Sequence, residues 1–361
     1  MGFDITASHQ NNVVVSVRAT AAQIERALYT NLVSRQRRDG SKFVTVDRDP
    51  SLDFAIPILR VSGLNETIRP TPGFHQAASA VFPDPGSGPG GLFGGNDFRT
   101  AYAPGATEAG NGEIVALVEF DDDFPGDVTA YRNQFGLPNV PVQKITFDGF
   151  SGPPGANNGE VTLDIDMAMS MAPGLDAIVL YQGQLADSIF GGLASPDGAV
   201  LPLQVSASWN YTVDATTQQL LVEMAVQGQS VFVISQDCGA YPSDPSDDRD
   251  MPFSTVVGGT VLSMTGSGVS YSSESAWPLS GGGILTNGPA IPSYQSGIAG
   301  VNGASNTFRN LPDVSAAASG IASAANGTGA LTGVGGTSAA APLWAAFTAP
   351  MNGPKKRGRP R

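Results

Sequence analysis

A serine among small residues is the first candidate for chemistry. Residues 335–342 read GGTSAAAP and run into an apolar stretch, Leu343–Ala349, that predicts a helix. A serine at the start of a helix lies beside unpaired backbone N–H groups and the positive end of the helix dipole, which favours a nucleophile and its oxyanion. The same position also suits a serine that only caps the helix. These residues alone leave Ser338 open between the two roles.

A serine nucleophile needs a base, and histidine is the usual one. The chain has two histidines, His9 and His75, and both precede or lie within a Pro- and Gly-rich stretch. We expect neither to belong to the large domain, which disfavours a Ser-His-Asp triad there. A Cys-His pair built on Cys238 is disfavoured for the same reason, and a single cysteine forms no internal disulfide. Carboxylates are therefore the candidate bases.

Two carboxylates stand four residues apart, Glu160 and Asp164, in a segment that ends at Pro173. On a helix they share one face, about one turn apart. Like charges at this spacing repel, so a pair that shares one proton would explain the arrangement. A solvent-exposed acidic face is the alternative. The apolar neighbours, Val161 to Met167, favour a largely buried helix.

A third candidate is Asp237, which follows the apolar run Val231–Ser235. Such a run predicts a buried strand, and the carboxyl ends of strands are where α/β sheets place functional groups. Because Gly239 follows shortly after, an ordinary turn aspartate is the alternative.

Short apolar runs must supply the elements that position these residues. Five of them predict strands buried on both faces: Ile114–Phe120, Ala177–Tyr181, Leu203–Ser208, Val231–Ser235 and Thr255–Val257. Helix-like segments lie between them: Asp127–Phe135, Glu160–Met171 and Thr216–Val226. This alternation predicts an α/β domain with a largely parallel sheet. Glycine and serine dominate residues 258–336, where we expect mostly loop.

The segment 1–70 has a pattern of its own. Val13–Val17 and Phe43–Val46 are strand-like, and Thr20–Val33 is helix-like. The following segment, 71–96, is rich in Pro, Gly and Ser, with little to bury, and predicts a linker open to proteolytic nicking.

Charge is spread unevenly along the 361 residues, whose net charge is −13. Residues 1–75 hold nine basic and seven acidic side chains, whereas residues 76–354 hold five basic and 25 acidic ones. So acidic a body argues against binding to nucleic acid or anionic membranes. It suits work at low pH, where protonation reduces the repulsion, and it equally suits simple solubility.

In this order, the motifs resemble those of the sedolisins, the serine-carboxyl peptidases. GGTSAAAP is similar to their nucleophile motif, and Glu160 and Asp164 before Ala172-Pro173 are similar to their catalytic helix. Asp237 falls where the family places its oxyanion aspartate, in a segment that usually reads GDSG and here reads QDCG.

Further segments extend the resemblance over nearly the whole chain. Glu119 matches an acidic residue that kumamolisin-type members link to the catalytic pair, and the SASW run that ends at Trp209 resembles the family's SxSW strand end. Other family segments follow in order: Val257–Thr260, Ser280–Gly283, Pro292–Gln295 and Pro312–Val314.

The resemblance implies a subtilisin-like α/β fold, a largely parallel sheet flanked by helices, behind a partial α+β pro-domain. The implied boundaries are a pro-domain in 1–70, a linker with a processing site in 71–96, a peptidase domain in 97–350 and a basic tail in 351–361. The implied roles are nucleophile for Ser338, base for Glu160, its partner for Asp164, oxyanion donor for Asp237 and support for Glu119 and Trp209.

With these roles the chain is expected to be an acid-acting endopeptidase, made as a zymogen, that hydrolyses polypeptides. Its own pro-segment is the expected intramolecular inhibitor or chaperone, and no cofactor site is assigned. The family is secreted and binds calcium through an Asp- and Gly-rich segment after the nucleophile. This chain ends at Arg361, soon after Ser338, without such a segment, so calcium is expected from the family while its ligands are absent here. The N-terminus shows no signal-peptide pattern, and no apolar run is long enough for a membrane helix.

Two alternatives to an active peptidase stay open. One is a truncated, inactive remnant with intact motifs. The other concerns Lys355–Arg361, which reads KKRGRPR and is foreign to the resemblance. Its Arg-Gly-Arg-Pro core is similar to a minor-groove AT-hook, so DNA association is expected, if anywhere, through this tail; a simple basic tag gives the same residues.

Overall fold

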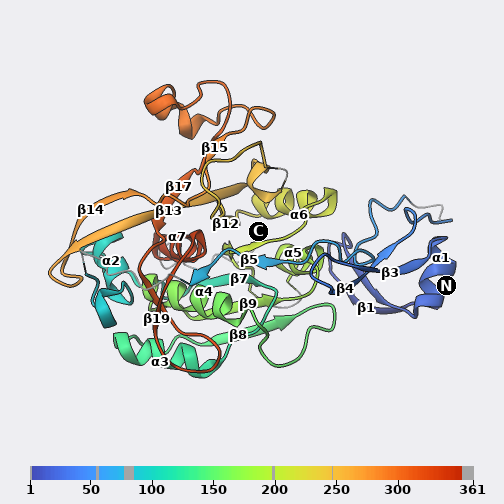
Figure 1. The fold of residues 1–361 in the computed structure, drawn as a ribbon, viewed down its shortest axis with the longest axis horizontal. Helices are drawn as coiled ribbons and strands as arrows, with labels where there is room; N and C mark the ends of the chain where they lie inside the picture. Colours follow the sequence, from blue (N-terminus) through green and yellow to red (C-terminus); the bar gives the residue numbers. More distant parts are fainter. Residues whose placement is uncertain (1, 54–56, 77–84, 197–199, 246, 352–361) are drawn as a thin grey trace, which may run out of the picture.

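The computed structural model describes residues 2–53, 57–76, 85–196, 200–245 and 247–351. Two parts are visible in Figure 1: a large body around a central sheet and a smaller N-terminal unit, drawn in blue at the right. We call the described residues up to Pro70 the N-terminal unit, and residues 85–351 the body. The basic tail lies outside the described residues.

Seven parallel strands form the central sheet, and an antiparallel strand lies at one edge. The parallel strands are β7 (Ile114–Glu119), β8 (Val142–Thr146), β9 (Ala177–Gln182), β10 (Gln204–Ala207), β12 (Ser230–Ile234), β13 (Ser254–Thr265) and β17 (Val314–Ala317). The order is β14-β13-β12-β10-β7-β9-β8, with β17 beside β13 and the edge strand β14 spanning Ser270–Ala276. The predicted α/β fold with a largely parallel sheet is confirmed.

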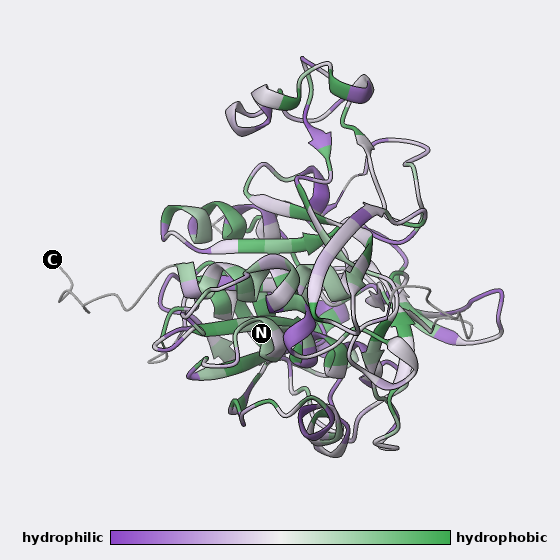
Figure 2. Ribbon diagram, turned by 90° about the vertical axis from the view of Figure 1, so that its left-hand side faces the viewer, coloured by the Kyte–Doolittle hydropathy of each residue, from purple (hydrophilic) through white to green (hydrophobic). Residues whose placement is uncertain are grey.

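The described helices of the body pack in a few groups. The bounds are α2 (Asn96–Tyr102), α3 (Pro125–Phe135), α4 (Asn158–Met171), α5 (Ala186–Ala194), α6 (Ala215–Val226) and α7 (Thr337–Met351). Helices α4 and α7 pack against each other and the sheet, α2 and α3 pack on α4, and α5 pairs with α6. Figure 2 shows hydrophobic residues concentrated in the central strands and in the helices beside them. No helix among the described residues is both long enough and apolar enough to span a membrane.

The N-terminal unit consists of two small antiparallel sheets and a helix. Its elements are β1 (Asp4–Ser8), β2 (Val15–Arg18), α1 (Ala21–Leu28), β3 (Leu32–Gln36) and β4 (Lys42–Val46). The helix predicted over Thr20–Val33 is too long. Tyr29 adopts a left-handed conformation with φ 51°, which ends α1 after Leu28, and Leu32 begins β3 instead.

Residues 71–76 do not behave as an unattached linker. The strand β5 (Thr71–Pro72) pairs with β11 (Trp209–Asn210), and β6 (His75–Gln76) pairs with β19 (Thr332–Gly335). Further on, Phe93 is buried and forms a bridge to Ile321 in β18 (Ile321–Ser323), which itself pairs with β19. The expectation that residues 71–96 bury little is therefore wrong at both ends, while residues 77–84 lie outside the described residues.

Residues 258–336 contain more strand than expected. The strand β13 continues to Thr265 and turns into β14, and β15 (Gly283–Ile284), β16 (Asn310–Leu311), β17, β18 and β19 follow. Loop still predominates between these strands, as expected, but the strands themselves were missed; β14, SYSSESA, is largely exposed and therefore shows no apolar run.

Candidate active site

The helix α4 carries Glu160 and Asp164. Every residue of α4 is buried, and both carboxyl side chains have no exposed surface. The loop before the helix is held by Asp121, whose carboxylate accepts the backbone N–H groups of Gly155 and Asn157 at 2.6 and 2.8 Å. The helix ends at Met171, since the residue before a proline avoids the helical region. The alternative of a solvent-exposed acidic face is wrong.

Ser338 is the second residue of α7 and is fully buried. Its Oγ donates to the carbonyl oxygen of Ser208, just after β10, at 3.3 Å. The hydroxyl therefore points toward the carboxyl end of the sheet. Because Ser338 lies inside α7 and not directly before its first residue, it is not placed as a capping residue.

Ser338 and the α4 carboxyls meet inside the body. The hydroxyl of Ser338 and the backbone N–H of Phe74 lie close enough to the Glu160 carboxylate to have a lowering effect on its pKa. Burial, together with the charge of Asp164, outweighs them and raises the pKa of Glu160 well above its ordinary value. Burial also raises the pKa of Asp164, against hydrogen bonding from Ser208 and Glu160.

These approaches to Glu160 and Asp164 fall short of full hydrogen bonds. Among the described residues, no donor in standard geometry reaches any of their four carboxyl oxygens. Two buried carboxylates without donors would be very costly if both were ionised. A proton held between the two groups removes most of that cost, which is the shared-proton arrangement.

Glu119, the last residue of β7, extends this row of carboxyls. It is fully buried and accepts a hydrogen bond of 2.9 Å from the indole N–H of Trp209. Burial first, and then the charge of Asp164, raises the pKa of Glu119 well above its ordinary value, although the Trp209 bond acts the other way. The structure therefore brings Glu119 and Trp209 to the site where the resemblance places them.

Asp237 lies shortly past the end of β12, opposite the start of α7. Its Oδ1 accepts both the backbone N–H and the hydroxyl of Thr337, at 2.9 and 2.8 Å. The contact fixes the first turn of the helix that carries Ser338. A Cβ added to Gly336 would lie 2.9 Å from Oδ2 of Asp237, so this oxygen faces Gly336.

The backbone of Gly73 and Phe74 also lies in the site, which the sequence patterns did not indicate. The N–H of Gly73 donates to the carbonyl of Ser208 at 3.1 Å, the same oxygen that accepts from Ser338. The run PTPGFH gave no sign of this, because it reads as linker and its pairing partners lie far along the chain.

The two histidines differ in their distance from the site. His9 lies in the N-terminal unit, buried against Gly191 and Phe147 of the body. His75 comes closer than expected, since its backbone in β6 pairs with Gly335. The expectation that it stays in a linker away from the body is wrong for its backbone.

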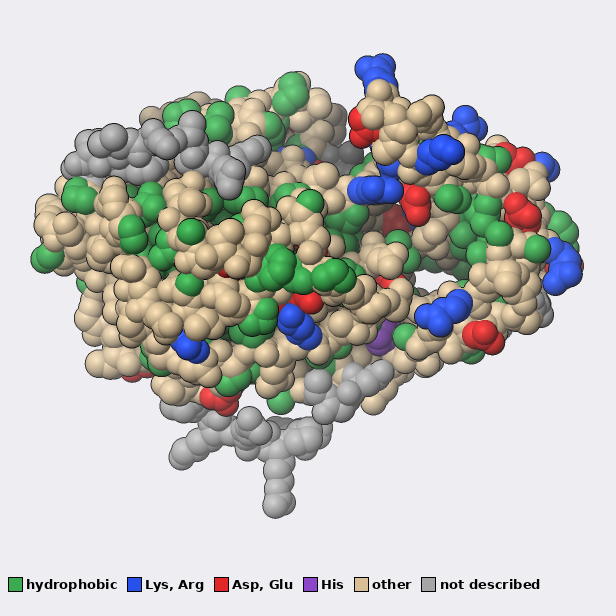
Figure 3. Space-filling view, turned by 60° about the horizontal axis from the view of Figure 1, so that its bottom comes forward, with side chains coloured by type: hydrophobic (Ala, Val, Ile, Leu, Met, Phe, Trp, Pro, Cys, Tyr) green, Lys and Arg blue, Asp and Glu red, His purple; other side chains and the backbone are tan. Residues whose placement is uncertain are grey.

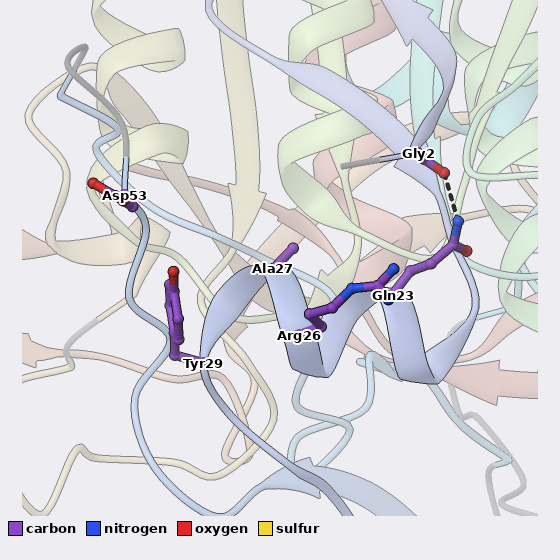
Figure 4. A pocket seen from close by; sticks show the side chains of 6 residues that line it. All are labelled: Gly2, Gln23, Arg26, Ala27, Tyr29 and Asp53. Carbon is purple, nitrogen blue, oxygen red and sulfur yellow. Dashed lines mark hydrogen bonds between the residues drawn. The ribbon is translucent and has the colours of Figure 1, made fainter.

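Two other features do not join the site. A surface pocket of about 470 Å³ lies on the N-terminal unit beside α1 (Figure 4), and none of the candidate catalytic residues lines it. Among the described residues, no three His, Cys, Asp or Glu side chains gather as a metal ion would require. The described residues therefore offer no such ligand set for the calcium that the resemblance implies, and calcium binding stays a prediction.

Comparisons with known proteins give the fold first. In solved structures, the chain is similar to Pseudomonas sedolisin, a serine-carboxyl proteinase, with a TM-score of 0.58 and 22% identity over 74% of this chain and 81% of that one. This similarity shows a shared subtilisin-like α/β fold.

Sequence comparison then gives two relatives. Kumamolisin from a Bacillus strain (MN-32) is 27% identical to the chain over 285 residues, which are 70% of this chain. Xanthomonalisin from a Xanthomonas strain (T-22) is 24% identical over 319 residues, and the match covers 69% of this chain. No family model matches the chain. The chain is a homologue of the sedolisin family, the serine-carboxyl peptidases, over about 70% of its length. It spans 50% of kumamolisin and 37% of xanthomonalisin.

Proposed function

We propose that the chain is an acid-acting serine-type endopeptidase in which carboxyl groups replace the usual imidazole. The observation that carries the proposal is the buried row of Ser338, Glu160 and Asp164, which meets the backbone of Gly73 and Phe74. A hydroxyl, a base and a peptide backbone in contact are what nucleophilic cleavage of an amide needs. Homology to serine-carboxyl peptidases supports the same chemistry.

In the proposed mechanism, Ser338 Oγ attacks the carbonyl carbon of the scissile bond. Glu160 takes the hydroxyl proton and then passes it to the leaving amine. Asp164 is the second carboxyl of the pair and shares a proton with Glu160. Glu119, which accepts a hydrogen bond from Trp209, is a further acidic group next to Asp164. Asp237, when protonated, donates to the oxyanion from beside Gly336.

Acidic conditions follow from the protonation states that this mechanism needs. Glu160 must lose a proton to act as a base, and Asp237 must keep one to act as a donor. Unperturbed carboxyls titrate near pH ~4, so both states coexist in acid. Because burial raises the pKa of Glu160, the acid limb of the rate profile should lie above the titration range of an ordinary glutamate.

The N-terminal unit is the proposed partner of the body as its inhibitor or folding aid. It docks through polar contacts: Asn11 donates to Glu223 at 3.0 Å, and the hydroxyl of Ser62 donates to Asp187 at 2.6 Å. Arg60 also forms an ion pair with Asp214. Figure 3 shows Lys and Arg side chains gathered on the right, where this unit lies, and few on the body. The contacts join a weakly basic unit to an acidic body.

The direct test is hydrolysis of casein by the full chain across pH 3–7, with the Ser338→Ala variant as the control. We expect cleavage that peaks in acid and disappears in the variant. A peak near neutrality would contradict the carboxyl mechanism. No cleavage at any pH, by protein that circular dichroism shows to be folded, would make the chain an inactive homologue.

A further inference from the structure

The segment from Thr71 to Gln76 crosses the candidate site as two short strands, β5 and β6, with Gly73 and Phe74 at a bend between them. Thr71 and Pro72 pair antiparallel with Asn210 and Trp209, and the following residues pair antiparallel with β19, just before Ser338. A peptide that binds in a cleft by strand addition pairs in this way with the strand edges on both sides of the nucleophile.

The register of this segment places one peptide bond, Gly73–Phe74, at Ser338. A Cβ on Gly336 would lie 2.7 Å from the carbonyl oxygen of Gly73 and 2.9 Å from Oδ2 of Asp237, so both oxygens face the same small space. On the other side of the bond, the N–H of Phe74 approaches the Glu160 carboxylate. The carbonyl thus faces the proposed oxyanion donor, and the leaving nitrogen faces the proposed acid.

Space, rather than backbone conformation, requires glycine at position 73. Gly73 is not among the residues with a positive φ, so its backbone would accept another residue. A Cβ there, however, would overlap the Cδ1 methyl of Ile234 and lie 2.9 Å from Ser338 Oγ. Ile234 is the last residue of β12 and only 2% exposed, so its methyl can move only by changing rotamer inside a packed core.

We propose that Ile234 closes the subsite for the residue before the scissile bond, so that the peptidase selects glycine there. The inference rests on the proposed function and adds the specificity of the peptidase for the residue before the scissile bond. The bond Gly73–Phe74 of its own chain meets this requirement. The subsite on the other side accepts an aromatic ring, because Phe74 packs against Gly159 of α4 and against the core.

The chemical step balances without a further reactant except water. Ser338 Oγ bonds to the Gly73 carbonyl carbon, and its proton moves to Glu160 and then to the nitrogen of Phe74. The C–N bond breaks, which leaves Gly73 as an ester on Ser338 and Phe74 with a free amine. Water then hydrolyses the ester: its hydroxyl group bonds to the Gly73 carbonyl carbon, which releases Gly73 as a carboxylic acid, and its other proton returns to Ser338 Oγ.

The first experiment measures kcat/KM, at the pH at which casein cleavage peaks, for hexapeptides Thr-Pro-X-Phe-His-Gln, in which X is Gly, Ala or Leu. One methyl group in a tight pocket changes rates by about 10–200-fold, so we expect Gly to exceed Ala by that order and Leu to be cleaved least. Ile234→Val deletes only the Cδ1 methyl and should bring the Gly/Ala ratio close to one. Val233→Ala is the matched control, because Val233 is buried on the opposite face of β12 and its truncation should leave the ratio unchanged.

The second experiment follows cleavage in the full chain by N-terminal sequencing. Wild-type protein should acquire the new N-terminus Phe74. Gly73→Ala should slow this cleavage at least about tenfold, and adding Ile234→Val to Gly73→Ala should restore it. Retained hydrolysis of the Gly peptide shows that a variant is folded.

Two results would overturn the specificity while leaving the proposed function standing. One is equal cleavage of the Gly and Leu peptides by the wild type. The other is Ser338-dependent cleavage of the chain only at bonds other than Gly73–Phe74. If neither the chain nor any peptide is cleaved, the proposed function fails and this inference fails with it.

Discussion

Glu160 owes its proposed reactivity to burial beside a second carboxyl. A carboxylate without donors in the protein interior is a much stronger base than one in water, since burial penalises its charged form. The pair with Asp164 keeps a proton within reach of both groups. A solvent-exposed glutamate at the same position would be a weak base for a serine hydroxyl.

The first prediction concerns Glu160→Gln. The glutamine keeps the shape of the side chain but accepts no proton, so kcat should fall about 10²–10⁴-fold. Asp166→Asn is the matched control, because Asp166 lies on the same helix, equally buried, and accepts from Ser323 at 3.3 Å instead of facing Ser338. It should keep normal turnover. If instead His75→Gln removed activity and Glu160→Gln did not, an imidazole would be the base.

The second prediction separates two roles of Asp237. Asp237→Ala should lower kcat about 10²–10³-fold, since it removes the oxyanion donor and also the acceptor that holds Thr337. Asp237→Asn keeps an acceptor for Thr337 and offers an amide donor, so it should retain more activity than the alanine variant. An amide does not lose its proton near neutrality, so the alkaline limb of the asparagine variant should move to higher pH. Identical pH profiles for wild type and Asp237→Asn would remove Asp237 from the oxyanion role.

At the scale of elements, the turn after β12 carries strain. Gln236 adopts φ 67°, in the left-handed region that side chains disfavour, and it precedes the aspartate that contacts α7. It is one of two positions, with Cys238, at which the QDCG run departs from the family's GDSG. The backbone of the turn therefore suits the glycine that the family usually has there.

The third prediction follows from that turn. Gln236→Gly should stabilise the protein by about 1 kcal/mol, because glycine adopts a positive φ at little cost. Urea unfolding at pH 5 measures the change as a shift in midpoint. The Gly239→Ala variant, which places a side chain at φ 70°, should be destabilised in the same assay. A destabilised Gln236→Gly variant would show that the glutamine side chain contributes more than its backbone costs.

Hydrophobic periodicity predicted the buried strands and helices of the body well. It predicted the strands made of small or polar residues poorly. Runs such as Ile114–Glu119 and the helix α4 are apolar enough to be recognised locally. The strands β14 and β19 are not, because their own residues are small or polar. The segment Thr71–Gln76 is not either, because its short strands form by pairing with strands far along the chain. The candidate residues at element ends could be named from spacing and resemblance. The contact of Gly73 with Ser338 could not, because it depends on how the whole sheet closes.

At the scale of the whole molecule, buried acidic groups set the pH dependence of stability. Burial is the largest cause that raises the pKa values of Glu119, Glu160, Asp164 and Asp166 in the fold. A raised folded pKa contributes stability that is fully present below the unfolded value, near pH ~4, and is lost as pH rises through the folded value. Each pKa unit corresponds to about 1.4 kcal/mol at 25 °C.

The fourth prediction is that the folded chain is more stable in mild acid than near neutrality. The urea midpoint of Ser338→Ala, which avoids self-digestion, should be higher at pH 4.5 than at pH 7.5. Asp166→Asn in that background should flatten the dependence, because the amide cannot ionise in the core. A midpoint that rises steadily from pH 4.5 to 7.5 would contradict the protonated state of these groups.

The strand pairing on either side of Ser338 has a consequence for the first moments of activity. If the Gly73–Phe74 bond is cleaved, the new amino end at Phe74 is still attached to the body and directly precedes β6, which pairs with β19. It would occupy the place that an incoming chain needs, so the freshly cut molecule competes with its own substrate. Progress curves of substrate hydrolysis should then show an initial lag. Its length should not depend on enzyme concentration, and it should end when the new amino end leaves the site.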